Sequence, residues 1–250
     1  MVTGDIRAIE KFHLLVLTQL GARVDKNLYA LKGGCNLRFF FKSIRYSQDI
    51  DFDVHTIARE TLRKNVNQIL TAPGFKSILR SSKIELTHLS EPKQTDTTQR
   101  WKAHVRIEGS PADLPTRIEF SRRKFDKEIV FEAVDSEIIR IHDLRPILAS
   151  HYGLEAALAQ KIDALASRTQ IQARHIFDLA LLAGCGGPAF KVPTIKKKAG
   201  VAAENAMSVT FDQFKSQVVA YLPPEYQEHY STRKVWDSLQ ETVLKILESL

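Results

Sequence analysis

The sequence predicts an α+β protein with two domains, a mixed-sheet domain over residues 1–145 and an all-helical domain over residues 146–250. Three observations predict this class. Alternation of polar and apolar residues, which is typical of strands, is confined to the first half. Helical spacing of Ala and Leu dominates the second half, and a chain of 250 residues is long enough for one large domain or two small ones.

The first half carries the strand signals. Alternation is cleanest from Trp101 to Glu108 and from Asp49 to Val54, where every second side chain faces the same side of a sheet. Strands are expected over residues 28–31, 47–54, 83–89, 101–108 and 117–121. Helices are expected over residues 6–20, 36–41 and 60–71. Pro73-Gly74 is expected to end the last of these, and the polar segment 90–99, with Pro92, is expected to be a loop.

The second half carries the helical signals. Residues 154–183 predict two helices with a break near 168–170, and helices are also expected over 211–221 and 234–250. The segment 184–198 contains Gly, Pro and the basic run Lys196 to Lys198, and is expected to be a loop. No internal repeat or low-complexity tract interrupts this organisation.

The composition is that of a globular protein with a basic surface. Hydrophobic residues make up 44% and charged residues 26% of the chain, which argues against disorder. Lys and Arg outnumber Asp and Glu by 36 to 29, giving a net charge of +7. A positive balance favours association with phosphate-rich partners without identifying any of them.

Cysteine usage and hydropathy exclude several classes of protein. Cys35 and Cys185 are too few and too far apart for a disulfide framework or a zinc site. Charged residues interrupt the first apolar stretch, so the N-terminus lacks a signal-peptide pattern, and no apolar run reaches the roughly 20 residues of a membrane span. We expect a cytoplasmic protein with no membrane partner.

An acidic strand carries the clearest chemical signal. Asp49, Asp51 and Asp53 alternate with apolar residues, so their carboxylates share one face of a strand. Such carboxylates suit Mg²⁺, which proteins hold with one or two carboxylates plus substrate phosphates. Gly33 and Gly34 lie upstream and offer backbone that a phosphate chain can approach closely, because no Cβ obstructs it. The two features together favour metal-assisted phosphoryl or nucleotidyl transfer over a solvent-facing acidic edge strand.

A third carboxylate commonly completes such a metal site. Glu119 alternates with Ile118 and Phe120, and it can point at the same cation if its strand lies beside the acidic strand. The alternative is a surface glutamate paired with Arg117 or Arg122. Asp53 is the competing third ligand, although nothing elsewhere in the sequence supports it.

Cations that could bind phosphates occur in both halves. Arg45 and Ser47 precede the acidic strand, where a guanidinium or a hydroxyl can contact phosphate oxygens, although Ser47 can equally cap a turn. Lys161 and Arg168 lie two helical turns apart on one face. Asp178 lies four residues after Arg174 and can pair with it. Charge pattern alone favours a solvated helix face, whereas the small and apolar neighbours of Lys161 and Asp178 suit partial burial.

Other nucleophilic or metal-binding sets are not apparent. The eight histidines are scattered without metal-ligand spacing, and no Ser/His/Asp or Cys/His set can be argued. Cys35 has no evident base, so we interpret it as a small buried residue at a tight turn.

Taken in order, four motifs resemble the AbiEii/AbiGii toxin family of nucleotidyltransferases, known from bacterial abortive-infection and toxin–antitoxin systems. The resemblance covers about residues 28–182. The motifs are the Gly pair in LKGGCNLR, the DxD in YSQDIDFDV, Lys161 with Ala164-Leu165 and Arg168, and Arg174 to Leu179. The resemblance implies a nucleotidyltransferase-like mixed sheet flanked by helices, with the helical domain completing the active site.

The resemblance also implies roles for individual residues. Asp49 and Asp51 would hold Mg²⁺, and Lys161 and Asp178 would complete the catalytic set. The candidate nucleotide-binding residues are Lys32, Gly33, Gly34, Arg45, Ser47 and Arg168. Lys161 would neutralise the leaving phosphates, and Asp178 would either orient Lys161 or accept a proton. Two departures from the family pattern are Cys35, where a hydroxyl residue is usual, and His175, where an Asp often follows the Arg.

The implied reaction is attack by an acceptor hydroxyl on the α-phosphate of an NTP, with pyrophosphate leaving. Family members act as toxins, some by modifying tRNA, and a co-encoded antitoxin neutralises them. The basic surplus is compatible with an RNA acceptor, and protein is the other macromolecular acceptor considered. Two alternatives remain on the same fold: a non-catalytic RNA-binding module, and an enzyme that modifies a small hydroxylated molecule such as an antibiotic.

Overall fold

The computed structural model describes residues 3–123, 128–186 and 193–250. The chain forms two compact units. The first unit contains Met1–Lys42 and Tyr46–Tyr152, and the second contains Ser43–Arg45 and Gly153–Leu250. The division follows Tyr152 rather than residue 145, because the strand that ends at Tyr152 is hydrogen-bonded into the sheet of the first unit.

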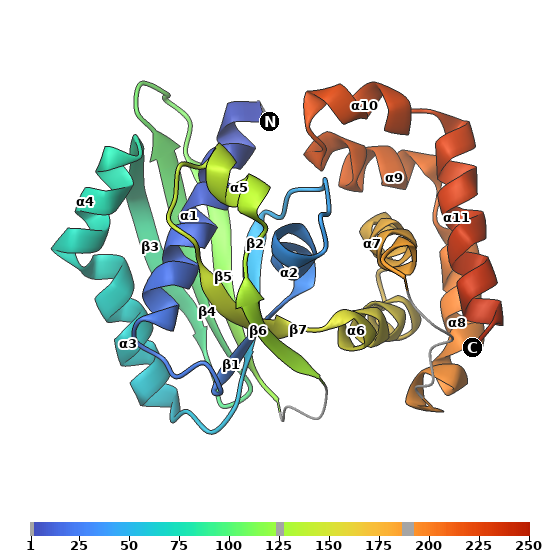
Figure 1. Cartoon of the computed structure of the whole chain (residues 1–250), viewed down its shortest axis with the longest axis horizontal. Helices are drawn as coiled ribbons and strands as arrows, with labels where there is room; N and C mark the ends of the chain where they lie inside the picture. Colours follow the sequence, from blue (N-terminus) through green and yellow to red (C-terminus); the bar gives the residue numbers. More distant parts are fainter. Residues whose placement is uncertain (1–2, 124–127, 187–192) are drawn as a thin grey trace. The chain divides into compact units, whose positions relative to one another are not determined.

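A seven-stranded mixed sheet forms the centre of the first unit (Figure 1). Its strands are β1 (Tyr29–Lys32), β2 (Asp49–Val54), β3 (Ile84–Gln94), β4 (Thr98–Ile107), β5 (Leu114–Arg122), β6 (Ile129–Ala133) and β7 (Leu148–Tyr152). Their spatial order is β3-β4-β5-β2-β1-β7-β6. The pairs β2–β5 and β1–β7 are parallel and the other neighbours are antiparallel. The predicted α+β class is therefore confirmed.

Helices bury one face of this sheet. The helices of the first unit are α1 (Thr3–Gly21), α2 (Gly33–Phe40), α3 (Arg59–Thr71), α4 (Pro73–Ser81) and α5 (Ser136–Ile141). Helices α1, α3 and α4 pack against the face that carries Ile50, Phe52, Trp101 and Phe120, all of which are buried (Figure 1). Alternation along the strands leaves charged side chains on the opposite face.

The structure corrects several predictions for the first unit. Helix α3 ends at Thr71, before Pro73, as predicted. The same proline also begins a further helix, α4, which was not predicted, because proline is tolerated at the first position of a helix. The expected loop over residues 90–99 is mostly a hairpin, since β3 continues through Pro92. An edge strand with a register shift between Ser90 and Lys93 tolerates this proline. The elements β6, α5 and β7 were not predicted.

The second unit is helical, as expected. It comprises α6 (Leu154–Ser167), α7 (Ala173–Gly184), α8 (Pro193–Ser208), α9 (Phe211–Gln217), the 3₁₀ helix η1 (Val219–Tyr221), α10 (Pro224–Tyr230) and α11 (Arg233–Glu248). The predicted break after α6 is confirmed. The basic run Lys196 to Lys198 lies on the exposed side of α8 and not in a loop, whereas residues 187–192 of that expected loop lie outside the described residues. Within the described part of the chain, no helix combines the length and apolarity needed to cross a membrane.

Candidate active site

The carboxylates predicted from the sequence lie on neighbouring strands of the first unit. Ile50 and Phe52 point into the core, so Asp49 and Asp51 occupy the opposite face of β2. Strand β5 runs parallel to β2, and Glu119 is the direct neighbour of Asp51 in the register. A role for Glu119 in the site required its strand to lie beside the acidic strand, and β5 does lie beside β2.

Arginines hold two of these three carboxylates. The Arg117 guanidinium donates to Asp49 Oδ2 over 2.6 Å, and the Arg100 guanidinium donates to Glu119 Oε2 over 2.6–2.7 Å. The Asp51 carboxylate has no hydrogen bond or ion pair with any described residue. These roles of Arg100 and Arg117 were not predicted, although both residues alternate onto the polar face of their strands.

Asp51 is the electrostatically costly group of the site. Burial and the negative charges of Asp49 and Glu119 raise its pKa, and the nearby Lys32 only partly opposes them. A carboxylate in this position is stabilised in its charged form by an added cation. Among the described residues, no three His, Cys, Asp or Glu side chains converge as a ready metal cage. Asp49 and Asp51 nevertheless match the donor set of Mg²⁺, which needs only one or two carboxylates when phosphates supply further oxygens.

Gly33 brings a helix N-terminus directly to Asp51. It is the first residue of α2 and has φ of +72°, a conformation that favours glycine. A Cβ built on Gly33 would lie 3.0 Å from Asp51 Oδ2, so a larger residue would crowd the carboxylate. Gly34 follows in the same turn, and the first N–H groups of a helix have no partner within the helix. The arrangement places backbone N–H groups of the kind that can bind an anion beside the Asp51 carboxylate.

Lys32 and Asp53 form a separate, buried ion pair. Lys32 Nζ lies 2.5 Å from Asp53 Oδ1, and the Tyr152 hydroxyl donates to Asp53 Oδ2 over 2.7 Å. Only 2% of Asp53 is exposed. These contacts join β1, β2 and β7, so both charges are engaged in holding the strands that flank the site.

Ser47 and Cys35 fix the main chain where the acidic strand begins. The Ser47 hydroxyl donates to the carbonyl oxygen of Asp49 over 2.8 Å, and the Cys35 thiol donates to the same oxygen over 3.3 Å. Cys35 is buried, and burial raises the pKa of its thiol well above the usual value. The thiol is therefore kept neutral, which agrees with its interpretation as a small buried residue rather than a nucleophile.

The second unit contains a buried charge cluster built on Asp178. Arg45 Nη2 donates to both carboxylate oxygens of Asp178, over 3.0 and 3.1 Å, and Lys161 Nζ donates to Oδ2 over 2.6 Å. Asp178 has no exposed surface. Burial raises the pKa of Asp178, but the two cations outweigh it and hold that pKa well below its usual value. Arg45, separated by 133 residues in sequence, joins Lys161 and Asp178 in this cluster.

The second unit also contains Arg168, a predicted nucleotide-binding residue, and His175, which was noted as a departure from the family pattern. Arg168, two turns beyond Lys161, is exposed at the end of α6, where it donates to the Gln172 side chain. His175 is buried on α7, and neither ring nitrogen has a hydrogen-bond partner within the described structure. Burial and the charge of Lys161 lower the pKa of His175, so the ring is neutral near pH 7.

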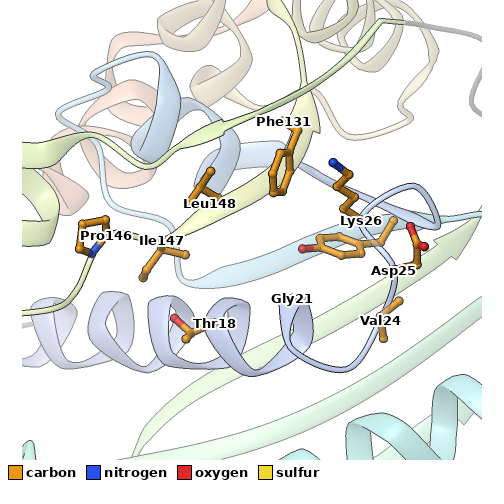
Figure 2. A pocket seen from close by; sticks show the side chains of 10 residues that line it. Thr18, Gly21, Val24, Asp25, Lys26, Phe131, Pro146, Ile147 and Leu148 are labelled. Atoms are coloured by element: carbon orange, nitrogen blue, oxygen red, sulfur yellow. The ribbon is translucent and has the colours of Figure 1, made fainter.

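A pocket elsewhere in the first unit does not include any of these residues. Its volume is about 490 Å³, and Thr18, Tyr29, Phe131 and Leu148 contribute to its walls (Figure 2). Lys26 Nζ lies 4.6 Å from the centre of the Phe131 ring at one end of the pocket. The pocket adjoins the start of β1, whereas the carboxylates lie beside its end.

Comparisons with known proteins identify the family and the fold of the chain. The model of the family described as nucleotidyl transferase AbiEii toxin, type IV toxin–antitoxin system, matches residues 15–237. Among solved structures, JHP933 from Helicobacter pylori is 17% identical, with a TM-score of 0.56 over 99% of this chain and 95% of that one. A second H. pylori structure, described as a nucleotidyltransferase, is 18% identical, with a TM-score of 0.56 over 100% and 94%.

A more distant similarity is to an antigenic nucleotidyltransferase-like protein from Paracoccidioides brasiliensis, which is 14% identical, with a TM-score of 0.50 over 92% of this chain and 99% of that one. No protein with curated annotation matches the sequence. The structural similarities show the fold, and the family match covers most of the chain. The chain therefore belongs to the AbiEii family of nucleotidyltransferase toxins of type IV toxin–antitoxin systems.

Proposed function

We propose that the protein transfers a nucleoside monophosphate from an NTP to a hydroxyl group of RNA, with Mg²⁺ held by Asp49 and Asp51. The family supplies the reaction class and the expectation of an antitoxin partner. The metal, the RNA acceptor and a cytoplasmic location are the further steps of the proposal. The net charge of +7 supports an RNA acceptor over a small cationic one such as an aminoglycoside-like antibiotic.

The contact between Gly33 and Asp51 carries this proposal. A nucleotidyl transfer site needs donors for the triphosphate next to ligands for the cation that accompanies it. The turn at Gly33 supplies backbone donors, and Asp51 approaches it so closely that an added Cβ would lie 3.0 Å from Asp51 Oδ2. Asp51 also has a raised pKa and no described cationic partner in contact, so a metal ion would lower its electrostatic cost.

Each site residue of the first unit would have a separate role in the reaction. Asp49 and Asp51 would hold the metal ion, with Glu119 as the candidate third ligand. Backbone N–H groups at Gly33 and Gly34 bind the triphosphate. Bound there, Mg²⁺ would supply charge neutralisation at the phosphates. The acceptor hydroxyl oxygen forms a bond to the α-phosphorus and releases its proton to solvent, as the bridging oxygen leaves with pyrophosphate. The rate enhancement would come mainly from positioning and electrostatics.

The catalytic roles of Lys161 and Asp178, and nucleotide binding by Arg168, stay predictions. Within the second unit, Asp178 accepts hydrogen bonds from two cations and has a lowered pKa, which makes it a weak proton acceptor. These properties support the role of orienting Lys161 over the role of general base.

The test is a transfer assay with each α-³²P-labelled NTP, Mg²⁺, and total RNA or total protein as the acceptor. We expect label in RNA with the wild-type chain, and none with Asp51→Asn or after chelation of the metal ion. Asp96→Asn is the matched control, because Asp96 is an exposed aspartate in the β3–β4 turn. Label in protein or in a small hydroxylated compound, with none in RNA, would move the acceptor to that class. No transfer from any NTP would refute the proposal.

A further inference from the structure

The face of strands β3 and β4 that α3 and α4 leave open is rich in positive charge. The antiparallel register pairs Lys93 with Arg100, Ser90 with Lys102, and His88 with His104. Partners in an antiparallel register point to the same side of a sheet. The apolar side chains of both strands, among them Trp101, face the core instead. We call this surface, formed by Lys93, Lys102, His88 and His104, the β3–β4 face.

Two lysines of the β3–β4 face are available to an anionic partner. Lys93 and Lys102 are exposed, and neither is in an ion pair with another described residue. Arg100, the register partner of Lys93, is paired with Glu119. An exposed lysine interacts with a phosphate group as a point charge on a flexible side chain. This kind of contact suits binding of a nucleic acid without preference for its sequence.

Two aromatic rings lie beside Lys102, at the next position of the register on the same face. The His88 and His104 rings have centroids 5.0 Å apart and are tilted by 45°. His88 is exposed and His104 is half-buried. Aromatic side chains on an open sheet face are platforms on which unpaired bases stack, and lysines beside them bind the backbone.

The β3–β4 face is continuous with the carboxylates. Lys102 is the register partner of Arg117 on β5, and Arg117 binds Asp49 on β2. Strand β4 is two strands away from β2. Neighbouring strands are about 4.8 Å apart, so β4, with His104, lies roughly 10 Å from the acidic strand, and β3, with His88, lies roughly 14 Å from it. A few nucleotides of a single strand span such distances.

From this arrangement we infer that the β3–β4 face binds the single-stranded end of an RNA and directs its terminal hydroxyl to Asp49 and Asp51. Lys93 and Lys102 contact phosphates, and His88 and His104 stack on bases. A single strand fits better than a duplex, because a base in a duplex cannot lie flat on an imidazole ring. This inference rests on the proposed nucleotidyl transfer for its direction, but the binding step does not depend on transfer.

The test measures binding of a short 5′-labelled single-stranded RNA by fluorescence anisotropy, without NTP, over a series of salt concentrations. For single strands, each neutralised phosphate contributes about 0.7 to the slope of log affinity against log salt. The double variant Lys93→Ala with Lys102→Ala is therefore expected to reduce that slope by about 1.4 and to weaken binding at least tenfold at low salt. His104→Ala is expected to weaken binding about tenfold with the slope unchanged, because stacking is not ionic.

Lys64→Ala is the matched control, because Lys64 is exposed on α3, which covers the other face of the sheet. We expect RNA affinity within twofold of the wild type for this variant. Stabilisation by Mg²⁺ and NTP in a thermal shift is expected to be unchanged in all three variants, which shows that they fold and keep the nucleotide site.

The outcomes separate this inference from the proposed function. Weaker RNA binding in the double variant supports the β3–β4 face even if no NMP transfer is found. Unchanged affinity and salt slope in the double variant overturn the inference, whether or not Asp51→Asn abolishes transfer. An equal loss in Lys64→Ala overturns it as well, because the binding would then follow net charge alone.

Discussion

Replacing Gly33 by alanine changes two quantities that can be separated. The residue has φ of +72°, and an L-residue held in this region costs roughly 1–2 kcal/mol. The added Cβ also lies 3.0 Å from Asp51 Oδ2, so the carboxylate must move by about 0.4 Å to reach an ordinary contact of 3.4 Å. A displacement of 1 Å at a reacting centre can cost about 100-fold in rate, so a shift of this size is expected to cost roughly tenfold in kcat.

Gly109→Ala isolates the backbone contribution. Gly109 has φ of +81°, and nothing lies within 4 Å of the position of its Cβ. Both variants are expected to lose roughly 1–2 kcal/mol of unfolding free energy in a denaturant titration. Only Gly33→Ala is expected to lose NMP transfer and to need more Mg²⁺ for half-maximal rate. Equal transfer rates in the two variants would refute the reasoning that Gly33 exists to admit Asp51 to the phosphate site.

Three further substitutions test the electrostatics of the two units. Asp178→Asn is expected to lower the unfolding free energy by about 3–5 kcal/mol, because it leaves Arg45 and Lys161 buried without their anion. A loss below about 1 kcal/mol in a denaturant titration would contradict this expectation. Asp51→Asn is expected to stabilise the protein at pH 7 by about 1 kcal/mol, or roughly 2–4 °C in Tm, because a neutral amide removes the burial of charge and the repulsion by Asp49 and Glu119 that raise the pKa of Asp51. A lower Tm for this variant would argue against an electrostatically costly carboxylate. Burial lowers the pKa of His13 to about 3, below its ordinary value of 6.5, so the unfolded chain takes up the proton first as the pH falls. The free energy of unfolding is then lost between pH 6.5 and 3 by up to about 1.4 kcal/mol per pH unit. His13→Gln is expected to reduce this pH dependence, measured by denaturant titration at several pH values. Parallel pH profiles of unfolding free energy for the variant and the wild type would contradict this prediction.

The fold was predictable where the signal is local. Alternation along β2 and β4 gave both strands and their buried faces, because the side-chain period of a strand is a property of consecutive residues. The prediction failed between β5 and α6, where β6 and β7 are short and lack clean alternation. Helix α4 was missed because Pro73 was interpreted as a stop, although the same residue is favourable at a first helical position.

The candidate site was predictable in its residue types but not in its pairings. The sequence identified Asp49, Asp51 and the Gly pair, and β-sheet register then placed Glu119 beside Asp51. That Arg45 would join Asp178 in the second unit, or that Arg117 would bind Asp49, could not be predicted. These contacts join residues 133 and 68 positions apart, and no periodicity in the chain encodes such a distance.

By itself, the sequence determined the α+β class, the acidic strand after a glycine pair, and the family resemblance that the family match confirms. Each of these follows from residue type and spacing along the chain. Only the tertiary structure showed which carboxylates have arginine partners and that the Asp51 carboxylate has none among the described residues. It also showed that Gly33 lies in close contact with Asp51. It also decided that the lysines and histidines of two strands share one open face. The physical reason is that charge and steric fit depend on distances in space, which strand register sets and sequence spacing does not.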